Sequence, residues 1–404
     1  MQDDELSLMP ESRETDLTLE NPAGSTITSD MVNTWIEVDA KALAYNLKQV
    51  RGLLRPGTRI AAVTKASAYG HGPRAAAVFA EAGADMLAVT HLSEALDIRR
   101  IGVKAPILLF SPQNAAQLPV AVANALTVTI GSADDARLAS AAAIAVGHPL
   151  FTHVKVDTGM GRIGVLPEDA PALLRLVRSL PGLQAQGIYM HFGTAMSRDL
   201  ARSREQWRLF QGIVSAVRSE GGMPLLAHCA NSAALLQMPE THMDMVRVGT
   251  LLYGQYPASF LSGRLALRST WRMFTRVLSL KDVPAGWAVG YGAERTTTRP
   301  SRLATIPVGY ADGLAVQVSA RSVLSFTDRL RAVLAAMRGP SHLYLLSEGR
   351  RVPVIGRVGM QISAIDVTDF PDIQVGSALE VPCRRVTSNP LIARIFCVDG
   401  TGSE

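Results

Sequence analysis

A lysine that closes an apolar run is the first residue in this chain that could carry covalent chemistry. Lys65 ends the run RIAAVTK, and ASAYGHG, which contains Tyr69 and two glycines, follows at once. A partly buried lysine can lose its proton and form a Schiff base with a carbonyl group. A tyrosine hydroxyl can bind a phosphate oxygen, and glycines let the backbone approach a ligand closely. An isolated lysine after a strand is normally a surface residue, so the neighbouring residues carry this interpretation.

The scarcity of lysine narrows the choice of a Schiff-base residue. Of the 40 basic residues, 34 are arginines, which cannot form a Schiff base. Lys155, in VKVDTGMGRIG, is also unusual because an ammonium group among apolar neighbours needs a partner, and Arg162 follows in the same segment. The lysines are Lys41, Lys48, Lys65, Lys104, Lys155 and Lys281.

A second group of candidates lies in the segment VRVGTLLYG. Arg247 would place a cation beside a bound cofactor, and the backbone N–H groups of Gly249 and Thr250 could bind phosphate. If the chain forms a barrel, this position fits, because barrels commonly bind phosphate after strands seven and eight. The alternative is a structural arginine paired with a carboxylate such as Asp244.

Polar residues also end other apolar runs, which is unusual for such positions. His191 lies in MHFGTA, and Asn231 and Ser232 lie in HCANSAA. Taken alone, His191 is explained as well by a buried histidine whose hydrogen bonds are satisfied. Comparable positions are held by His91, Ser111 and Asp157.

The elements that must position these residues are eight short apolar runs, most of them separated by segments of helical periodicity. Runs buried on both faces and separated by helices indicate a parallel sheet. Eight runs in about 200 residues predict an α/β fold, a (β/α)8 TIM-like barrel, whose functional groups gather at the C-terminal ends of the strands. A doubly wound open sheet fits the alternation too. The runs cover residues 59–65, 85–91, 106–111, 126–131, 150–158, 183–192, 224–232 and 244–254.

The pattern changes after about residue 263, where β-like runs separated by turns predict a mostly β domain. We expect a disordered polar tail over residues 1–32, a cofactor-binding barrel over 33–262 and a β-rich C-terminal domain over 263–404. The segment WIEVD, within residues 33–40, is expected to be a strand that joins the β domain. The stretch 314–350 is untypical and partly helical in pattern.

Composition limits the classes of partner. The net charge of +5 over 404 residues is weak, and no dense basic run with interleaved aromatic residues supports nucleic-acid binding. No uncharged run reaches the eighteen or so residues that span a bilayer, and the acidic N-terminus lacks the order of a signal peptide. The three cysteines show no metal-ligand spacing and indicate reduced thiols. We therefore expect a cytoplasmic protein without membrane or nucleic-acid partners and without a metal.

Eight motifs, in order, resemble those of the alanine racemase family, which are fold-type III enzymes dependent on pyridoxal 5′-phosphate (PLP). VTKASAYGHG is similar to the family's PLP-lysine motif, with Ser67 in place of an asparagine. The resemblance runs from TWIEVD to about LEVP, which is most of the chain past residue 33. The other motifs are VKVDTGMGRIG, MHFGTA, HCANSAA, VRVGTLLYG, VGYG, IPVGYADG and VIGRVGM.

The resemblance implies racemisation of a small amino acid, most directly L-alanine to D-alanine for peptidoglycan precursors. PLP stabilises the carbanion at Cα, and two bases on opposite faces exchange the proton. Lys65 would carry PLP and serve one face, and Tyr291, in VGYG, would serve the other. In the family this tyrosine reaches the lysine of the other subunit. The resemblance therefore implies a head-to-tail homodimer with shared sites.

The same motifs imply the remaining site residues. His191 would link Tyr291 to Arg247, and Lys155 matches a family lysine that can be carbamylated. The residues placed around PLP are Tyr69, Ser232 and the backbone of Gly249 and Thr250 at its phosphate, Arg247 at the pyridine nitrogen and Arg162 at the phenolic oxygen, with Asn231 as a further cofactor-binding residue. The residues placed at the substrate are Arg162, Tyr310 and the backbone N–H of Met360.

Departures from the family pattern gather in the β domain, which shapes the substrate entrance. GYADGLAV lacks the usual Pro-Arg, the segment at Met360 lacks its acid, and CRRVTSNPLIARIF has no match for the family's late tyrosine. Serine or a broader range of amino acids is therefore the nearest alternative to alanine. Two further alternatives are a PLP decarboxylase of related fold, which would use other lysine motifs, and a PLP-binding barrel protein without activity, against which Tyr291 speaks.

Overall fold

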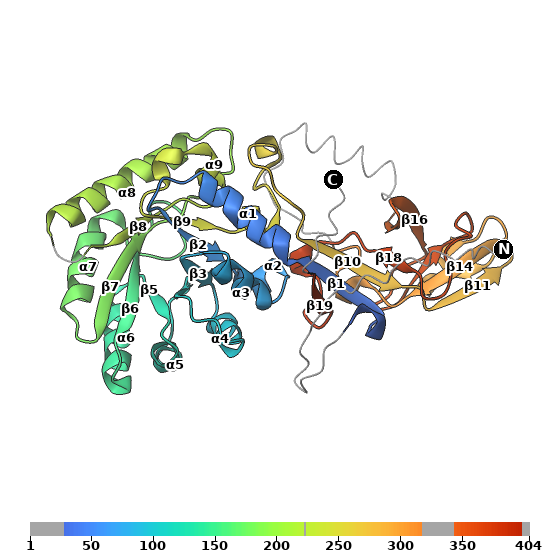
Figure 1. Cartoon of the computed structure of the whole chain (residues 1–404), viewed down its shortest axis with the longest axis horizontal. Helices are drawn as coiled ribbons and strands as arrows, with labels where there is room; N and C mark the ends of the chain where they lie inside the picture. The colour runs from blue at the N-terminus through green and yellow to red at the C-terminus, as the bar shows by residue number, and fades with distance from the viewer. Residues whose placement is uncertain (1–27, 222–223, 317–342, 398–404) are drawn as a thin grey trace, which may run out of the picture.

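The structure is a computed structural model that describes residues 28–221, 224–316 and 343–397. It consists of a barrel and, beside it, an elongated sheet domain (Figure 1). Of the tail expected over residues 1–32, Ser29–Met31 form a single 3-10 turn and residues 1–27 lie outside the described part. Most of the untypical stretch 314–350 also lies outside it.

Eight parallel strands form the barrel and confirm the predicted (β/α)8 fold. The first strand pairs with both the second and the eighth, as a closed barrel requires. The seventh and eighth are joined by backbone hydrogen bonds from Asp244 N–H to Ala227 O and from Arg247 N–H to Ala230 O. The alternative of an open sheet is therefore wrong. The strands are β2 (Arg59–Val63), β3 (Met86–Val89), β4 (Ile107–Leu109), β5 (Thr127–Ile130), β6 (Leu150–Lys155), β7 (Leu183–Tyr189), β8 (Leu226–His228) and β9 (Met245–Val248).

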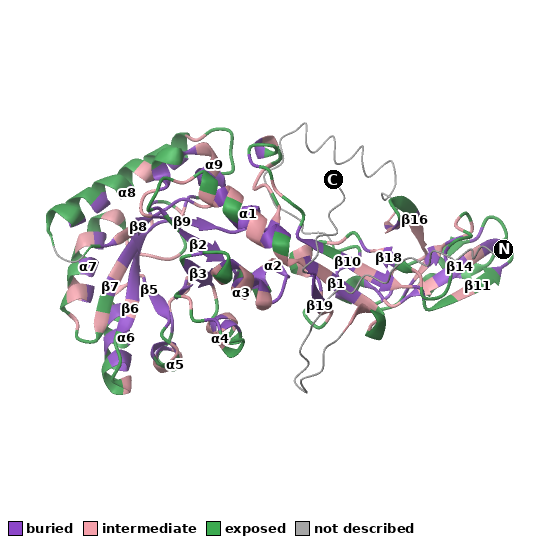
Figure 2. Ribbon diagram, in the orientation of Figure 1, coloured by how far each residue is buried: buried purple, intermediate pink, exposed green. Residues whose placement is uncertain are grey.

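Helices cover the outside of the barrel, and the longer ones carry an apolar stripe at helical spacing that packs against it. Helix α8 buries Phe210, Ile213, Val214 and Val217 and exposes its polar face (Figure 2). None of the described helices is both long and apolar enough to cross a membrane. The helices are α1 (Ala40–Gly52), α2 (Lys65–Tyr69), α3 (Arg74–Glu81), α4 (Leu92–Arg100), α5 (Leu118–Ala123), α6 (Ala133–Val146), α7 (Ala170–Ser179), α8 (Ala201–Ser219) and α9 (Ser232–Gln237).

The interior of the barrel is divided into an apolar half and a polar half. Side chains alternate along a strand, so those that do not pack against the helices point inward. On β2, β3, β4 and β9 the inward side chains are mostly small or apolar, and they form a separate cluster around Ala61, Val63 and Met86. On β5 to β9 the interior instead holds buried polar groups, namely Thr127, Thr129, His153, Lys155, Tyr189, His228 and Arg247.

The second domain is built on a nine-stranded sheet into which the first strand of the chain is inserted. Strand β1 pairs in parallel with β19 and antiparallel with β10. The sheet order is β11-β14-β17-β16-β15-β18-β10-β1-β19, and β12 and β13 form a separate pair. The strands are β1 (Thr34–Asp39), β10 (Trp271–Arg276), β11 (Ser279–Val283), β12 (Ala288–Val289), β13 (Arg295–Thr296), β14 (Ser301–Ile306), β15 (Tyr344–Ser347), β16 (Arg350–Ile355), β17 (Ser363–Asp366), β18 (Ala378–Glu380) and β19 (Ala393–Cys397).

Two arginines of the sheet domain, the buried Arg394 and the partly buried Arg385, bind backbone carbonyls of the barrel. Arg394 on β19 donates from Nε to Gly70 O at 3.2 Å, and Arg385 donates to Tyr253 O. Gly70 has a φ of +86°, and a Cβ there would overlap the backbone of Arg385. The segment that follows Lys65 is thus attached directly to the second domain.

Candidate active site

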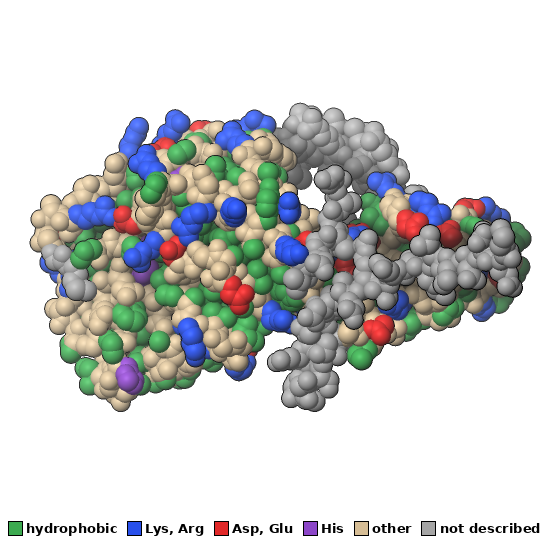
Figure 3. All heavy atoms as spheres, in the orientation of Figure 1, with side chains coloured by type: hydrophobic (Ala, Val, Ile, Leu, Met, Phe, Trp, Pro, Cys, Tyr) green, Lys and Arg blue, Asp and Glu red, His purple; other side chains and the backbone are tan. Residues whose placement is uncertain are grey.

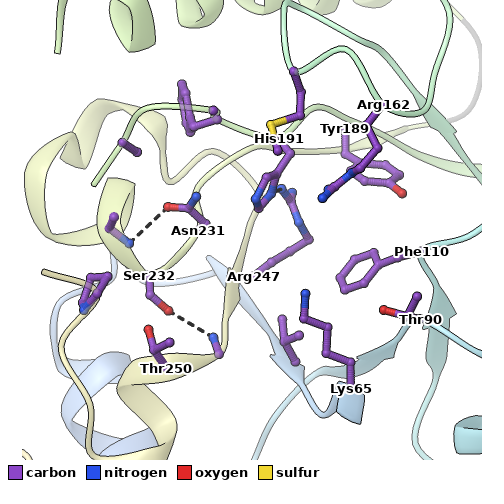
Figure 4. A pocket seen from close by; sticks show the side chains of 18 of the residues that line it. Lys65, Thr90, Phe110, Arg162, Tyr189, His191, Asn231, Ser232, Arg247 and Thr250 are labelled. Carbon is purple, nitrogen blue, oxygen red and sulfur yellow. Dashed lines mark hydrogen bonds between the residues drawn. The ribbon is translucent and has the colours of Figure 1, made fainter. Parts of the chain in front are cut away.

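A cavity of about 520 Å³ opens at the C-terminal ends of the barrel strands. It brings together eleven of the residues singled out from the sequence, although they come from segments up to 185 positions apart. Figure 4 shows Lys65, Arg162, His191 and Arg247 around a common space. The eleven residues are Lys65, Tyr69, Ser111, Lys155, Arg162, His191, Asn231, Ser232, Arg247, Gly249 and Thr250.

The charge of this cavity is strongly one-sided. Four basic side chains line it, Lys65, Lys155, Arg162 and Arg247, and none of the described lining residues is an aspartate or a glutamate. Buried cations are costly unless they are paired or hydrogen-bonded. The cavity is therefore suited to a ligand that brings its own negative charges. On the face of the molecule in Figure 3, by contrast, basic side chains are spread out.

Lys65 is held by an unusual turn of backbone. The four residues after it, Ala66 to Tyr69, all have φ between +50° and +55° and form a left-handed turn. The carboxylate of Glu94 accepts from the N–H groups of Ala66, Thr90 and His91 and so ties this turn to the next strand end. Partial burial lowers the pKa of Lys65, and the charge of Arg162 lowers it further. Both effects increase the fraction of neutral, nucleophilic amine.

Arg247 is fully buried and bound by neutral acceptors. Its Nη1 donates to His228 Nδ1 at 2.8 Å and to His228 O at 3.0 Å. Its Nη2 donates to Met190 O at 2.7 Å, to Cys229 O at 3.2 Å and to His191 Nδ1 at 3.3 Å. Within the described residues Nε makes no hydrogen bond, which leaves one fixed donor for a ligand. Asp244 binds Arg218 instead, so the alternative of an Arg247–Asp244 pair is wrong.

The bond from Arg247 also assigns the tautomer of His191. A guanidinium can only donate, so Nδ1 of His191 must be the acceptor and Nε2 must carry the proton. Burial and the charge of Arg247 lower the pKa of His191 to about 3, so the ring is neutral near pH 7. His191 therefore presents an N–H donor to a group that approaches its far side.

Several donors gather at the end of the cavity beside Gly249. The backbone N–H of Gly249 donates to Ser232 Oγ at 3.1 Å, and a Cβ at Gly249 would overlap the hydroxyl of Tyr69. Burial raises the pKa of Tyr69 to about 12, so its hydroxyl stays protonated and can donate. Asn231 caps helix α9 by accepting from the N–H groups of Ala233 and Ala234, which fixes Ser232 in the first turn.

The loop that carries Arg162 is built around one carboxylate. Asp157 accepts from the N–H groups of Gly159, Met160, Gly161 and Arg162. These bonds direct Asp157 into its own loop, while Arg162 reaches toward the space above Lys65 (Figure 4).

Lys155 lies inside the polar half of the barrel. Its Nζ donates to Val156 O at 2.7 Å and lies 5.3 Å from the centre of the Tyr189 ring. Burial, with the charges of Arg247 and Arg162, lowers its pKa to about 7. A large share of this amine is therefore neutral, which is the form that a carbamylation would require.

Three of the expected site residues lie outside this cavity. Tyr291, Tyr310 and Met360 belong to the sheet domain and are exposed, with Tyr291 at 73% and Met360 at 61% of full exposure. His91 and Asp157, which also end apolar runs, are not among the lining residues. Within one chain, the residues around Lys65 are thus separated from the expected second base.

Several lining residues were not anticipated from the sequence. Thr90, Phe110 and Tyr189 line the cavity, and His228 holds Arg247 from below. Tyr189 stacks on His228 with ring centres 4.8 Å apart and binds Thr129 through its hydroxyl. The alternation within each strand could have indicated Tyr189 and His228, because each shares a strand face with an inward polar position.

Comparison with known proteins agrees with this arrangement. The family model described as "Alanine racemase, N-terminal domain" matches residues 38–257, and that of the C-terminal domain matches residues 270–394. The alanine racemase of Desulfosudis oleivorans is 38% identical over 360 residues, covering 86% of this chain and 87% of that protein. The alanine racemase of Desulfovibrio desulfuricans is 39% identical over 345 residues, covering 85% and 87%.

Solved structures show the same likeness over the full architecture. Alanine racemase from Clostridium difficile 630 has a TM-score of 0.80 at 27% identity, covering 90% of this chain and 96% of that one. Alanine racemase from Bacillus anthracis with bound L-Ala-P has a TM-score of 0.78 at 27% identity, covering 91% and 96%. The two family models together match most of the chain, and the two relatives named first are 38% and 39% identical to it. The chain belongs to the alanine racemase family.

Proposed function

We propose that this chain racemises alanine with PLP as its cofactor. The observation that carries the proposal is the cavity around Lys65, which has four basic groups and no acidic one among its described lining residues. Such a lining favours a ligand with a phosphate at one end and an amino-acid carboxylate at the other. The relatives named above are alanine racemases, and one structure contains L-Ala-P.

The residues present fit PLP at three points. The donors beside Gly249 suit a phosphate, because a hydroxyl, a tyrosine and backbone N–H groups near the start of a 3-10 turn at Thr250 converge there. The free Nε–H of Arg247 suits the pyridine nitrogen. Arg162 would face the phenolic oxygen, and the amine of Lys65 is available for covalent attachment. When bound, PLP would supply an electron sink for negative charge at Cα.

The chain's own groups would then move the proton. The lowered pKa of Lys65 suits an amine that takes a proton from Cα and returns it on one face. Because Arg247 can only donate, a ring nitrogen that faces it stays unprotonated, which weakens the electron sink and suppresses side reactions. Tyr291 is proposed as the base of the other face, with the N–H of His191 as its hydrogen-bond donor. Tyr310 and the backbone N–H of Met360 are proposed to bind the substrate carboxylate.

The second base leads us to propose a head-to-tail homodimer. Tyr291, Tyr310 and Met360 all belong to the sheet domain and are exposed, outside the cavity of their own chain. A partner's sheet domain placed over each cavity would complete two shared sites and cover these side chains. We further propose a domain boundary near residue 263. We also propose that the protein is cytoplasmic and that its cysteines are reduced, since the three described cysteines are free.

The test combines covalent labelling with isotope exchange. Borohydride reduction after PLP addition is expected to leave a phosphopyridoxyl group on Lys65, detected by peptide mass spectrometry. Lys65→Ala should abolish the label, and Lys104→Ala, at an exposed lysine, should leave it intact. No label on Lys65 would contradict the cofactor assignment.

The substrate is decided by following solvent deuterium into Cα over a panel of L- and D-amino acids. Alanine is expected to exchange fastest from either enantiomer. Faster exchange of serine would move the substrate assignment to serine, and exchange of none would contradict racemase activity.

A further inference from the structure

Below the cavity, two buried histidines extend the contact of Arg247 toward the bottom of the barrel. His228 on β8 accepts from Arg247 Nη1 through Nδ1, and its Nε2 lies 2.8 Å from Nδ1 of His153 on β6. Both side chains are completely buried. The three groups form one hydrogen-bonded series that begins at Nη1 of Arg247, the guanidinium whose free Nε–H is proposed to face the cofactor.

Arg247 determines which ring nitrogen carries the proton in His228 and in His153. Because Arg247 can only donate, Nδ1 of His228 is unprotonated and its Nε2 carries the proton. That N–H must donate to Nδ1 of His153, so the proton of His153 lies on its own Nε2. The arrangement thus requires the same tautomer, Nε2–H, at both rings.

Neither ring carries a charge that could disturb this assignment. Burial and the charge of Arg247 lower the pKa of His153 to about 3 and that of His228 well below its ordinary value. The two rings are therefore neutral at physiological pH, and their tautomers are the variable that matters.

Burial of the His153 side chain in the barrel carries a free-energy cost. Its Nε2 has no hydrogen-bond partner among the described residues. Strand β7 also carries a glycine opposite it, because a Cβ at Gly187 would lie 2.7 Å from the imidazole ring. An apolar side chain would fill this space without an unmet donor. A residue that is buried despite this cost, as His153 is, is a candidate for a functional role.

We propose that His153 is a positioning residue for the racemase site. The lone pair on its Nδ1 holds His228 in the Nε2–H tautomer, and His228 in turn fixes the guanidinium of Arg247 between His228 and His191. With the other tautomer, an N–H of His228 would face the N–H groups of Arg247 and repel them. The effect on turnover rests on the proposed function, whereas the tautomers are a property of the protein alone.

Two substitutions of similar shape distinguish the effect of the Nδ1 lone pair of His153 from the effect of its packing. Asparagine places Oδ1 where histidine has Nδ1, so His153→Asn keeps an acceptor for His228. Leucine places a methyl group there, so His153→Leu removes it. Turnover is expected to fall about tenfold in His153→Leu, because one hydrogen bond is lost. In His153→Asn, which keeps the acceptor, turnover is expected to be close to that of the native protein.

The direct readout is the ring 15N spectrum of histidine-labelled protein, recorded without substrate. His153 and His228 are expected as Nε2–H tautomers, and His153→Leu should give His228 a fraction of the Nδ1–H form. His71 is the internal control, because its Nδ1 lies 2.9 Å from Ala68 O and must carry the proton, and its signal should not change.

Three results would overturn the proposal. The first is a native His228 in the Nδ1–H form. The second is an equal loss of turnover in both variants with the His228 signal unchanged, which would mean packing alone. The third applies if His153→Leu does not fold, and it is a His153→Asn protein that loses both turnover and the native His228 signal. A native chain that shows the expected tautomers but no racemisation would contradict the proposed function instead.

Discussion

At the scale of single residues, the site depends on how burial changes the charge of basic groups. Lysine, arginine and histidine side chains meet in one cavity that has no acidic residue among its described lining residues, and burial lowers the pKa of Lys65, Lys155 and His191. His191 is neutral near pH 7, the pKa of Lys155 falls to about 7, and Arg247 keeps its charge while it binds carbonyls. An anionic cofactor would relieve the charges that remain.

Lys155 provides a test through the pH dependence of stability. Its pKa falls from 10.5 to about 7 on folding, so between these values the unfolded chain binds a proton that the folded chain does not. Stability should therefore rise with pH across this window, by roughly 2–4 kcal/mol, and the penalty is fully present below pH 7. Chemical denaturation at pH 7 and pH 10, in buffers free of carbon dioxide, measures the rise.

The matched variant is Lys155→Met, which keeps the length of the side chain and cannot titrate. Its stability should rise less over the same interval, because the contributions of all other groups are shared with the native chain. An identical rise in both proteins would show that the amine of Lys155 is not responsible.

At the scale of elements, the left-handed turn after Lys65 stores strain beside the reactive amine. A residue with a Cβ in this conformation costs about 1–2 kcal/mol, and Ala66, Ser67, Ala68 and Tyr69 all adopt it. Backbone hydrogen bonds from Gly70 and Gly72 to Ser67 O and the carboxylate of Glu94 hold the turn in place. The conformation of this turn places Lys65 and Tyr69 at the same cavity.

Opposite effects of the same substitution test this account. Ser67 is exposed and its φ is +51°, so Ser67→Gly should stabilise the protein by about 0.5–1 kcal/mol. Ser215 is exposed in the right-handed helix α8, and Ser215→Gly should destabilise it by about 0.5 kcal/mol. Urea denaturation measures both values. A loss of stability in Ser67→Gly would mean that the turn is not strained there.

At the scale of the whole molecule, Arg394 and Arg385 join the sheet domain to the barrel. Arg394 donates to Gly70 O, Asn389 O, Pro390 O and Ser388 Oγ, and to no carboxylate among the described residues. Arg394→Met should reduce the free energy of unfolding by roughly 2–4 kcal/mol, because these acceptors, of which Gly70 O and Ser388 Oγ are buried, lose a charged donor. Arg272→Met, which removes a half-exposed ion pair with Glu380, should cost less than about 1 kcal/mol. Equal effects in denaturation would contradict the special role of Arg394.

The proposed dimer predicts that two inactive variants restore each other. Lys65→Ala and Tyr291→Phe each remove one base, and a hybrid dimer would contain one site with both. After full subunit exchange, about a quarter of the native activity should return, because half of randomly formed dimers are hybrids with one intact site. Exchange is verified by native mass spectrometry with one variant isotope-labelled. No recovery after verified exchange would place both bases in the same chain.

Much of the fold could be predicted because it depends on local patterns. Eight apolar runs at regular intervals, with helical periodicity between most of them, specify a barrel through burial alone, and each run contains its observed strand. The segments around Lys65 and Arg247 were recognisable because their glycines and polar residues interrupt apolar runs. The sheet domain was harder to predict in detail, since its neighbouring strands are often far apart in the chain, as β1 and β19 are.

The sequence by itself therefore determined that Lys65 and Arg247 end barrel strands and lie at one face, because strand direction and alternation are local properties. Only the tertiary structure decided which side chains line the cavity at that face, with no acidic residue among those described, and that Asp157 binds its own loop. It also placed His153 against His228 and kept Tyr291 outside the cavity of its own chain. The contact between His153 and His228 joins residues 75 positions apart, and barrel closure and domain packing, rather than periodicity, bring such residues together or keep them apart.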